Sequence, residues 1–291
     1  MNRIFEHFHL NLVMKDQPDL LGKALSREKW MRFIFSEGFS FHHRNKTLHW
    51  VPHGDQTEMI LGTIERRKVR TQHKGPDEGA AEFDGEEWQG SIVIIDPVHR
   101  KDGQKLAFER DKDVGEPNAI LDSVVSHFND QQEHPYTIVV RSLFDADTFR
   151  AFARRHGEVV RYVNFSFVVP NMFFGASTSV DQGLRRIGGS TGAQTVDLRL
   201  QSQEGVKADS PDVTDALAYA EAGNASVTAK AMNGDLYSST SRRLTVKMQS
   251  ILNLAKDSKE SVAKWLGQAL GREQVDSVGS ADRAGSDADL S

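Results

Sequence analysis

Two carboxylates on neighbouring strand-like segments are the first residues whose types and spacing could do chemistry. Asp96 ends a strongly apolar segment, and Glu109 lies on the segment expected to be its hairpin partner. Metal-dependent nucleases hold Mg²⁺ between acidic side chains and need a lysine near the attacking water. Here Asp111 occupies the position where the usual acid-any-lysine triplet carries lysine. Asp96 also precedes Pro97, which is typical of a simple turn, so both interpretations stay open.

Four histidines could contribute to a metal site instead. His7 and His9 are two residues apart on the strand expected over residues 4–14, so both imidazoles share one face. His42 and His43 lie on another expected strand, where adjacent residues point to opposite faces, so at most one of them could join. Three imidazoles suit a metal ion such as zinc. The alternative is that these histidines are buried or at the surface and bonded to their neighbours.

The sequence lacks the motifs of several enzyme classes. It has no cysteine, which excludes disulfides, thiol catalysis and thiolate metal sites. It has no GxxxxGKS or GxxxxGKT phosphate loop, no GxGxxG fingerprint and no HExxH motif. The Gly-rich segment at residues 188–192 has no lysine and no preceding strand, which favours a flexible linker. We therefore expect no cofactor.

Arginines give a pattern that is typical of binding. Their guanidinium groups donate two parallel hydrogen bonds and suit phosphate. The residues predicted to bind nucleic acid are Arg141, Arg150, Arg154, Arg155, Arg185, Arg186, Arg242 and Arg243, with further basic residues at Arg161, Arg66, Arg67, Lys68 and Arg70. Phe173 and Tyr237 could offer faces on which bases stack. The alternative is a set of solvated faces balanced by the many acids, because the clusters need not converge and the net charge is −5.

A strand–helix–strand unit at residues 135–171 must position much of this chemistry. Its first segment is β-branched and aromatic, as buried strands are. Asp145 can cap the following helix, whose apolar residues recur at three- and four-residue spacing. Residues 159–169 then alternate as a second strand. We expect Phe152 and Phe165 of this unit to be core residues.

Hairpin signals mix with helical crossovers along the chain, which predicts the α+β class, with mixed, mostly antiparallel sheets and helices packed on their faces. The expected regions are a strand-rich part at 1–90, a central β-β-α-β-α-β unit at 91–171, a β-α-β-β unit plus helix at 194–270, and a disordered tail at 271–291. Residues 66–90 are polar and are expected to form a long, mobile surface loop.

Length and composition are those of an ordinary globular protein. The 291 residues can bury a large core, and 38% hydrophobic and 8% aromatic residues are usual for that class. The sequence contains no apolar run long enough to span a membrane, and its N-terminal segment lacks a secretory signal. We therefore expect a cytoplasmic protein without membrane contact.

Three segments carry a resemblance to other proteins. IIDPVHRKDGQKLAFER, FSFVVPNMFFG and NGDLYSST together resemble uncharacterised bacterial proteins that sit among phage-defence and mobile-element genes. The resemblance implies a cytoplasmic role in bacterial antiviral defence or in nucleic-acid transactions. It carries over no catalytic residue.

These patterns favour a non-catalytic, intracellular binding or accessory protein that contacts DNA, RNA or a partner protein in bacterial anti-phage defence. One alternative is a metal-dependent nuclease that uses Asp96 and Glu109. Another is a structural subunit of a protein complex, either with a different protein or as a homo-oligomer.

Overall fold

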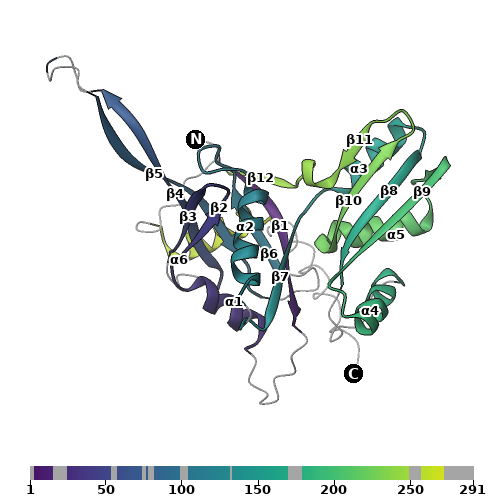
Figure 1. Cartoon of the computed structure of the whole chain (residues 1–291), viewed down its shortest axis with the longest axis horizontal. Helices are drawn as coiled ribbons and strands as arrows, with labels where there is room; N and C mark the ends of the chain where they lie inside the picture. The colour runs from purple at the N-terminus through teal and green to yellow at the C-terminus, as the bar shows by residue number, and fades with distance from the viewer. Residues whose placement is uncertain are drawn as a thin grey trace, which may run out of the picture.

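The computed structural model describes residues 3–15, 25–53, 58–73, 77, 82–98, 104–131, 133–169, 179–248 and 257–271. Within these ranges, twelve strands form two sheets, and six α-helices accompany them (Figure 1). Every strand pairing described is antiparallel. The predicted α+β class with mostly antiparallel sheets is confirmed.

The larger sheet is arranged around β1. Its strands are β1 (Arg3–Met14), β2 (Phe39–His43), β3 (Lys46–Pro52), β4 (Ile60–His73), β5 (Glu82–Ile95), β6 (Gln104–Glu109), β7 (Tyr136–Ser142) and β12 (Thr245–Met248). β6 pairs with one edge of β1. On the other edge, β12 pairs with the first residues of β1 and β7 with the last, so β12 and β7 follow one another along it. From β6 the order runs through β5, β4 and β3 to the edge strand β2.

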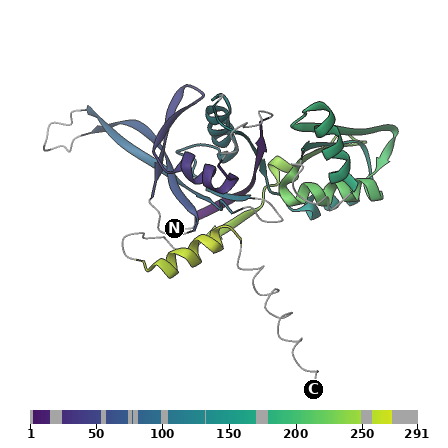
Figure 2. The same ribbon diagram turned by 90° about the horizontal axis from the view of Figure 1, so that it is seen from below.

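Alternation along β1 gives this sheet two apolar faces. Phe8 points to one face and packs in a core with α1 (Arg27–Phe35) and α2 (Pro117–Asn129). Phe5 points to the other face, which α6 (Lys259–Ala269) covers. Figure 2 shows α6 on the side of the sheet opposite to α1 and α2. No helix in the described ranges is long and apolar enough to cross a membrane.

The smaller sheet has its helices on one face. Its strands, in spatial order, are β11 (Leu236–Ser238), β10 (Ala225–Ala231), β8 (Val159–Val168) and β9 (Thr195–Lys207). The α-helices that accompany it are α3 (Ala146–Arg155), α4 (Ser179–Thr191) and α5 (Pro211–Tyr219). Two short turns complete it, the π-helical turn η2 (Ala220–Asn224) and the 3₁₀ turn η3 (Ser239–Ser241). Alternate residues of β8, such as Phe165, form a core with α3, α4 and α5. The side chains between them point to the face that these helices leave uncovered.

Residues 144–243 form a module inserted into the larger sheet, between β7 and β12. The N–H of Leu143 donates to His7 O (2.9 Å), and the N–H of His7 donates to Leu244 O (3.0 Å). Leu244 in turn donates to Leu143 O (2.8 Å), so the outgoing and returning chains lie side by side. We call residues 144–243 the inserted module and the remaining described residues the body.

This insertion divides the chain differently from the regions expected. The three elements at residues 135–171 all form, but β7 belongs to the larger sheet and β8 to the smaller one. The expected 91–171 unit is therefore shared between the two sheets, and the 194–270 unit is shared in the same way. Local spacing identifies each strand, whereas its partner is decided by long-range pairing that the pattern does not contain. Of the expected tail at 271–291, residues 272–291 lie outside the described residues.

The expected loop at residues 66–90 is wrong, because β4 and β5 run through most of it. They pair continuously from Ile60–Ile95 to His73–Glu82 and project beyond the sheet as a two-stranded arm (Figure 1). A strand beyond the sheet has no core to face, so it lacks the apolar alternation by which strands are recognised. The expected linker at 188–192 is also wrong in part, since α4 continues to Thr191.

The module docks onto the body through η2. His9 Nδ1 donates to the carbonyl oxygen of Gly223 (2.8 Å). Gly223 has a left-handed φ of +84°, and a Cβ on it would lie 2.3 Å from His9 Cβ and 2.8 Å from Leu143 Cδ2. Only glycine satisfies both the backbone conformation and this close approach.

Replacing Gly223 with alanine should therefore weaken docking of the module. The left-handed conformation alone should cost roughly 1–2 kcal/mol, and overpacking against His9 should add about 1–3 kcal/mol. Gly234→Ala is the matched control, because Gly234 has φ +100° but nothing within 4 Å of the added Cβ. Denaturant unfolding of both variants measures the difference, and equal losses would show that the close approach contributes nothing.

Candidate functional site

The two carboxylates predicted for a nuclease site do not come together. The N–H of Asp96 donates to Lys105 O, which places Asp96 beside Lys105 of β6. Glu109 lies four residues further along this strand, so at 3.3 Å per residue it is about 13 Å away from that position. Asp96 Oδ1 accepts the N–H of Val98 (3.1 Å) in a turn. Two oxygens that bind one Mg²⁺ must each lie about 2 Å from it, so Asp96 and Glu109 cannot share an ion.

Glu109 is held by neighbours within the fold. One guanidinium nitrogen of Arg3 donates to both carboxylate oxygens, at 2.8 and 2.7 Å, and the N–H of Ile92 donates to Oε2 (3.1 Å). Burial raises the pKa of Glu109, while the Ile92 hydrogen bond and Arg3 oppose that rise. This environment is that of a structural ion pair at the edge of β6.

The histidines are also separated. His7 Nε2 donates to the carbonyl oxygen of Ala269 at the end of α6 (2.7 Å), and burial lowers the pKa of this imidazole. His9 instead contacts Gly223, as described above. His43 Nδ1 bonds Ser123 of α2, on the opposite face of the sheet, and His42 is exposed. Within the described ranges, no three His, Asp or Glu side chains gather where they could hold a metal ion.

The eight predicted nucleic-acid-binding arginines are spread over several elements, and three of them bond carboxylates within the protein. Arg150 bonds Asp147 (2.8 Å), Arg185 bonds Asp181 (3.1 Å), and Arg243 bonds the buried Glu6 (2.5 Å). The exposed members are Arg154, Arg155, Arg186 and Arg242. Figure 1 shows α3 and α4, which carry five of the eight, at opposite ends of the inserted module. The eight therefore do not form one continuous surface.

Arg141 lies between the two parts of the molecule. It is half-buried on β7, and burial lowers its pKa, while Asp122 of α2 and Asp197 of β9 raise it. The Nε atom of Arg141 is buried and has no hydrogen-bond acceptor among the described residues. This arginine thus faces carboxylates from both the body and the inserted module.

The predicted stacking residue Tyr237 is unsuited to that role. It is 5% exposed, and its hydroxyl bonds Thr148 Oγ1 (2.8 Å). Burial raises the pKa of this phenol, although the Thr148 hydrogen bond opposes the rise. Phe173 lies outside the described residues.

The uncovered face of the smaller sheet is a surface of polar side chains. Its rows are set by cross-strand register and consist of Lys230, Tyr162 and Gln201, then Thr228, Asn164 and Arg199, then Ser226, Ser166 and Asp197. The side chains on β9 are exposed, and those on β8 and β10 are half-buried by their neighbours. An antiparallel sheet can face water in this way when one face is packed.

Tyr162 and Arg199 form the centre of this face. The guanidinium carbon of Arg199 lies 4.2 Å from the centroid of the Tyr162 ring, so the two groups stack. Neither Arg199 nor Lys230 forms a salt bridge with any described residue. The sheet thus presents two cations without a salt-bridge partner among the described residues, beside an aromatic ring and a row of hydroxyl and amide groups. We call Tyr162, Asn164, Arg199, Thr228 and Lys230 the polar face.

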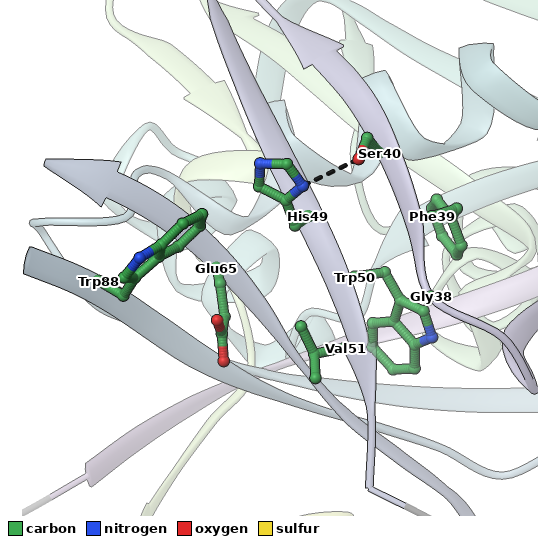
Figure 3. A pocket seen from close by; sticks show the side chains of 8 residues that line it. All are labelled: Gly38, Phe39, Ser40, His49, Trp50, Val51, Glu65 and Trp88. Carbon is green, nitrogen blue, oxygen red and sulfur yellow. Dashed lines mark hydrogen bonds between the residues drawn. The ribbon is translucent and has the colours of Figure 1, made fainter.

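A second surface lies on the larger sheet, on the same side as α6 but beyond it. A shallow hollow of about 430 Å³ is lined by Gly38, Phe39, Ser40, His49, Trp50, Val51, Glu65 and Trp88 (Figure 3). Ser40, His49 and Glu65 lie side by side on β2, β3 and β4. Ser40 Oγ bonds His49 Nδ1 (2.8 Å), and the Trp88 ring meets His49 edge-on with centroids 5.4 Å apart. We call this hollow the Trp88 groove.

Sequence reasoning missed both surfaces. Alternation in residues 159–169 places Tyr162 and Asn164 opposite the core, but only the pairing with β9 brings Arg199 over the ring. Trp88 lies in the segment expected to be a loop, so its place on a strand beside His49 could not be predicted. No protein-family model matches the chain, and a search of curated proteins finds no match.

Proposed function

We propose that this protein is a non-catalytic binding protein whose inserted module holds single-stranded nucleic acid on its polar face. The observation that carries the proposal is the stacked pair of Tyr162 and Arg199 on a sheet face that the described helices leave uncovered. Single-stranded binding combines cations that follow the phosphates with planar groups on which bases stack. Arg199 offers its guanidinium plane, and Lys230 adds a second cation.

Single strands fit this face better than duplexes do. The bases of a single strand can splay onto an open sheet face and stack on aromatic or guanidinium planes. Reading a duplex through the major groove needs a helix or a two-stranded ribbon that enters the groove. The polar face carries no helix or ribbon that could enter a groove, and its hydroxyl and amide groups suit base edges without selecting one sequence.

Titration of fluorescently labelled single strands and duplexes tests the proposal. We expect single-stranded DNA or RNA to bind more tightly than duplex and to weaken as salt rises. Two phosphate contacts predict a slope of log K against log salt of about −1.4. Absence of binding at low salt, or tighter binding of duplex than of single strands, would contradict the proposal that this protein binds single-stranded nucleic acid.

Binding of a partner protein is the second candidate function, and the Trp88 groove favours it. An exposed aromatic side chain beside polar groups in a hollow is typical of interface anchor sites. The setting in bacterial antiviral defence stays a prediction from the resemblance alone.

A further inference from the structure

The Trp88 groove contains a carboxylate without a cation. Glu65 is half-buried on β4 and accepts a hydrogen bond from Thr63 Oγ1 (3.1 Å). No described lysine, arginine or histidine forms a salt bridge with it. Arg67, two residues further along the same strand, bonds Glu86 instead. A partly desolvated carboxylate gains more from an added cation than a fully exposed one does.

The groove also keeps an aromatic plane open to solvent. Trp88 is 51% exposed, whereas Trp30, Trp50 and Trp265 are at most 6% exposed. Gly90 lies opposite Glu65 on β5 and has no side chain. A Cβ there would lie in van der Waals contact with Glu65 Cγ, at 3.5 Å, so the glycine leaves this space unfilled. The space beside the carboxylate therefore stays open.

We propose that the Trp88 groove binds the guanidinium group of an arginine side chain from a partner protein. Glu65 would accept the two parallel hydrogen bonds that a guanidinium fork donates. Trp88 would stack on the guanidinium plane, because the face of an indole ring attracts a cation. Ser40 and His49 supply further polar atoms at the rim. The charge of the groove and its open ring together select arginine over neutral side chains.

Trp88 itself reports occupancy. Because the other three tryptophans are buried, an aqueous quencher of indole fluorescence acts mainly on Trp88. The probe is a blocked Gly-Arg-Gly tripeptide, with Gly-Lys-Gly and Gly-Gln-Gly as comparisons, titrated against the full chain. We expect the arginine peptide to protect Trp88 from the quencher, the lysine peptide to do so more weakly, and the glutamine peptide not at all.

Glu65→Gln is the decisive variant, because it removes the charge and keeps the shape. It should weaken binding of the arginine peptide at least tenfold. Glu37→Gln is the control, since it removes an exposed charge that lies beside Gly38 but does not line the groove, and it should change affinity less than twofold. Near-UV circular dichroism checks that both variants are folded. Equal binding of all three peptides, equal binding of lysine and arginine, or wild-type affinity in Glu65→Gln would each overturn the proposal.

Discussion

Replacing Phe165 with alanine should unfold the inserted module at much lower denaturant concentration and leave the body nearly unchanged. Phe165 has no exposed surface, lies on β8 between β9 and β10, and stacks on Phe167 with ring centroids 5.6 Å apart. Truncating a fully buried phenylalanine costs about 3–5 kcal/mol through lost transfer energy and the cavity left behind. The core that Phe165 joins is separate from the two cores of the body.

The distribution of tryptophans lets one experiment separate the two parts. All four tryptophans lie in the body, so their fluorescence follows unfolding of the body alone, whereas far-UV circular dichroism follows both parts. Phe165→Ala should shift only the circular dichroism transition. Phe108→Ala, which truncates a fully buried side chain of β6, should shift the fluorescence transition together with the part of the circular dichroism signal that comes from the body. Phe152→Ala should cost less than Phe165→Ala, because Phe152 is half-buried. A Phe165→Ala variant in which both signals shift together would show one cooperative unit.

Arg243→Gln should lower the free energy of unfolding by about 3 kcal/mol. The Arg243 guanidinium lies 2.5 Å from the carboxylate of Glu6, which is 2% exposed, and 3.4 Å from Glu116. Arg110 is the other cation near Glu6, at 3.7 Å. Removing one partner of a buried ion pair leaves a charge uncompensated, which costs far more than the pair itself contributes. Denaturant unfolding measures this loss.

Two further variants test whether Arg243 stabilises the fold through its ion pair with Glu6. Arg242→Gln should change stability by less than about 0.5 kcal/mol, because Arg242 is exposed and adjacent to Arg243 without sharing its partners. Adding Glu6→Gln to Arg243→Gln should restore much of the lost stability, because the stranded charge is then gone. A stable Arg243→Gln variant would contradict the structural role given to this arginine.

Periodicity predicted most elements but not their partners. The strands and the helix at residues 135–171 are readable because buried apolar residues recur with the period of each element. That β7 and β8 join different sheets depends on pairing with β1 and β10, which are distant in the sequence. The arm formed by β4 and β5 was missed because its strands project beyond the body. Phe165 is buried as expected, whereas Phe152 is only half-buried.

The candidate sites were harder to predict for the same reason. Arginine clusters are visible in the sequence, but whether an arginine faces solvent or a buried carboxylate is decided by neighbours elsewhere in the chain. Arg243 and Arg185 illustrate this, since both bond carboxylates that are at most 4% exposed. Arg199 and Glu65, by contrast, belong to no pattern that marks a site in the sequence. They become candidate site residues only because strand pairing brings Tyr162 near Arg199 and Trp88 near Glu65.

Charge reversal on the two sides of the inserted module tests the proposed function most directly. The double variant Arg199→Glu/Lys230→Glu changes the polar face, and Arg150→Glu/Arg154→Glu changes α3, which packs on the opposite face of the same sheet. Both remove two positive charges and add two negative ones, so long-range effects match. Fluorescence anisotropy with a labelled single strand at low salt should show a loss of at least tenfold for the polar-face variant and less than twofold for the α3 variant. A larger loss in the α3 variant, or wild-type affinity in the polar-face variant, would contradict binding on the polar face.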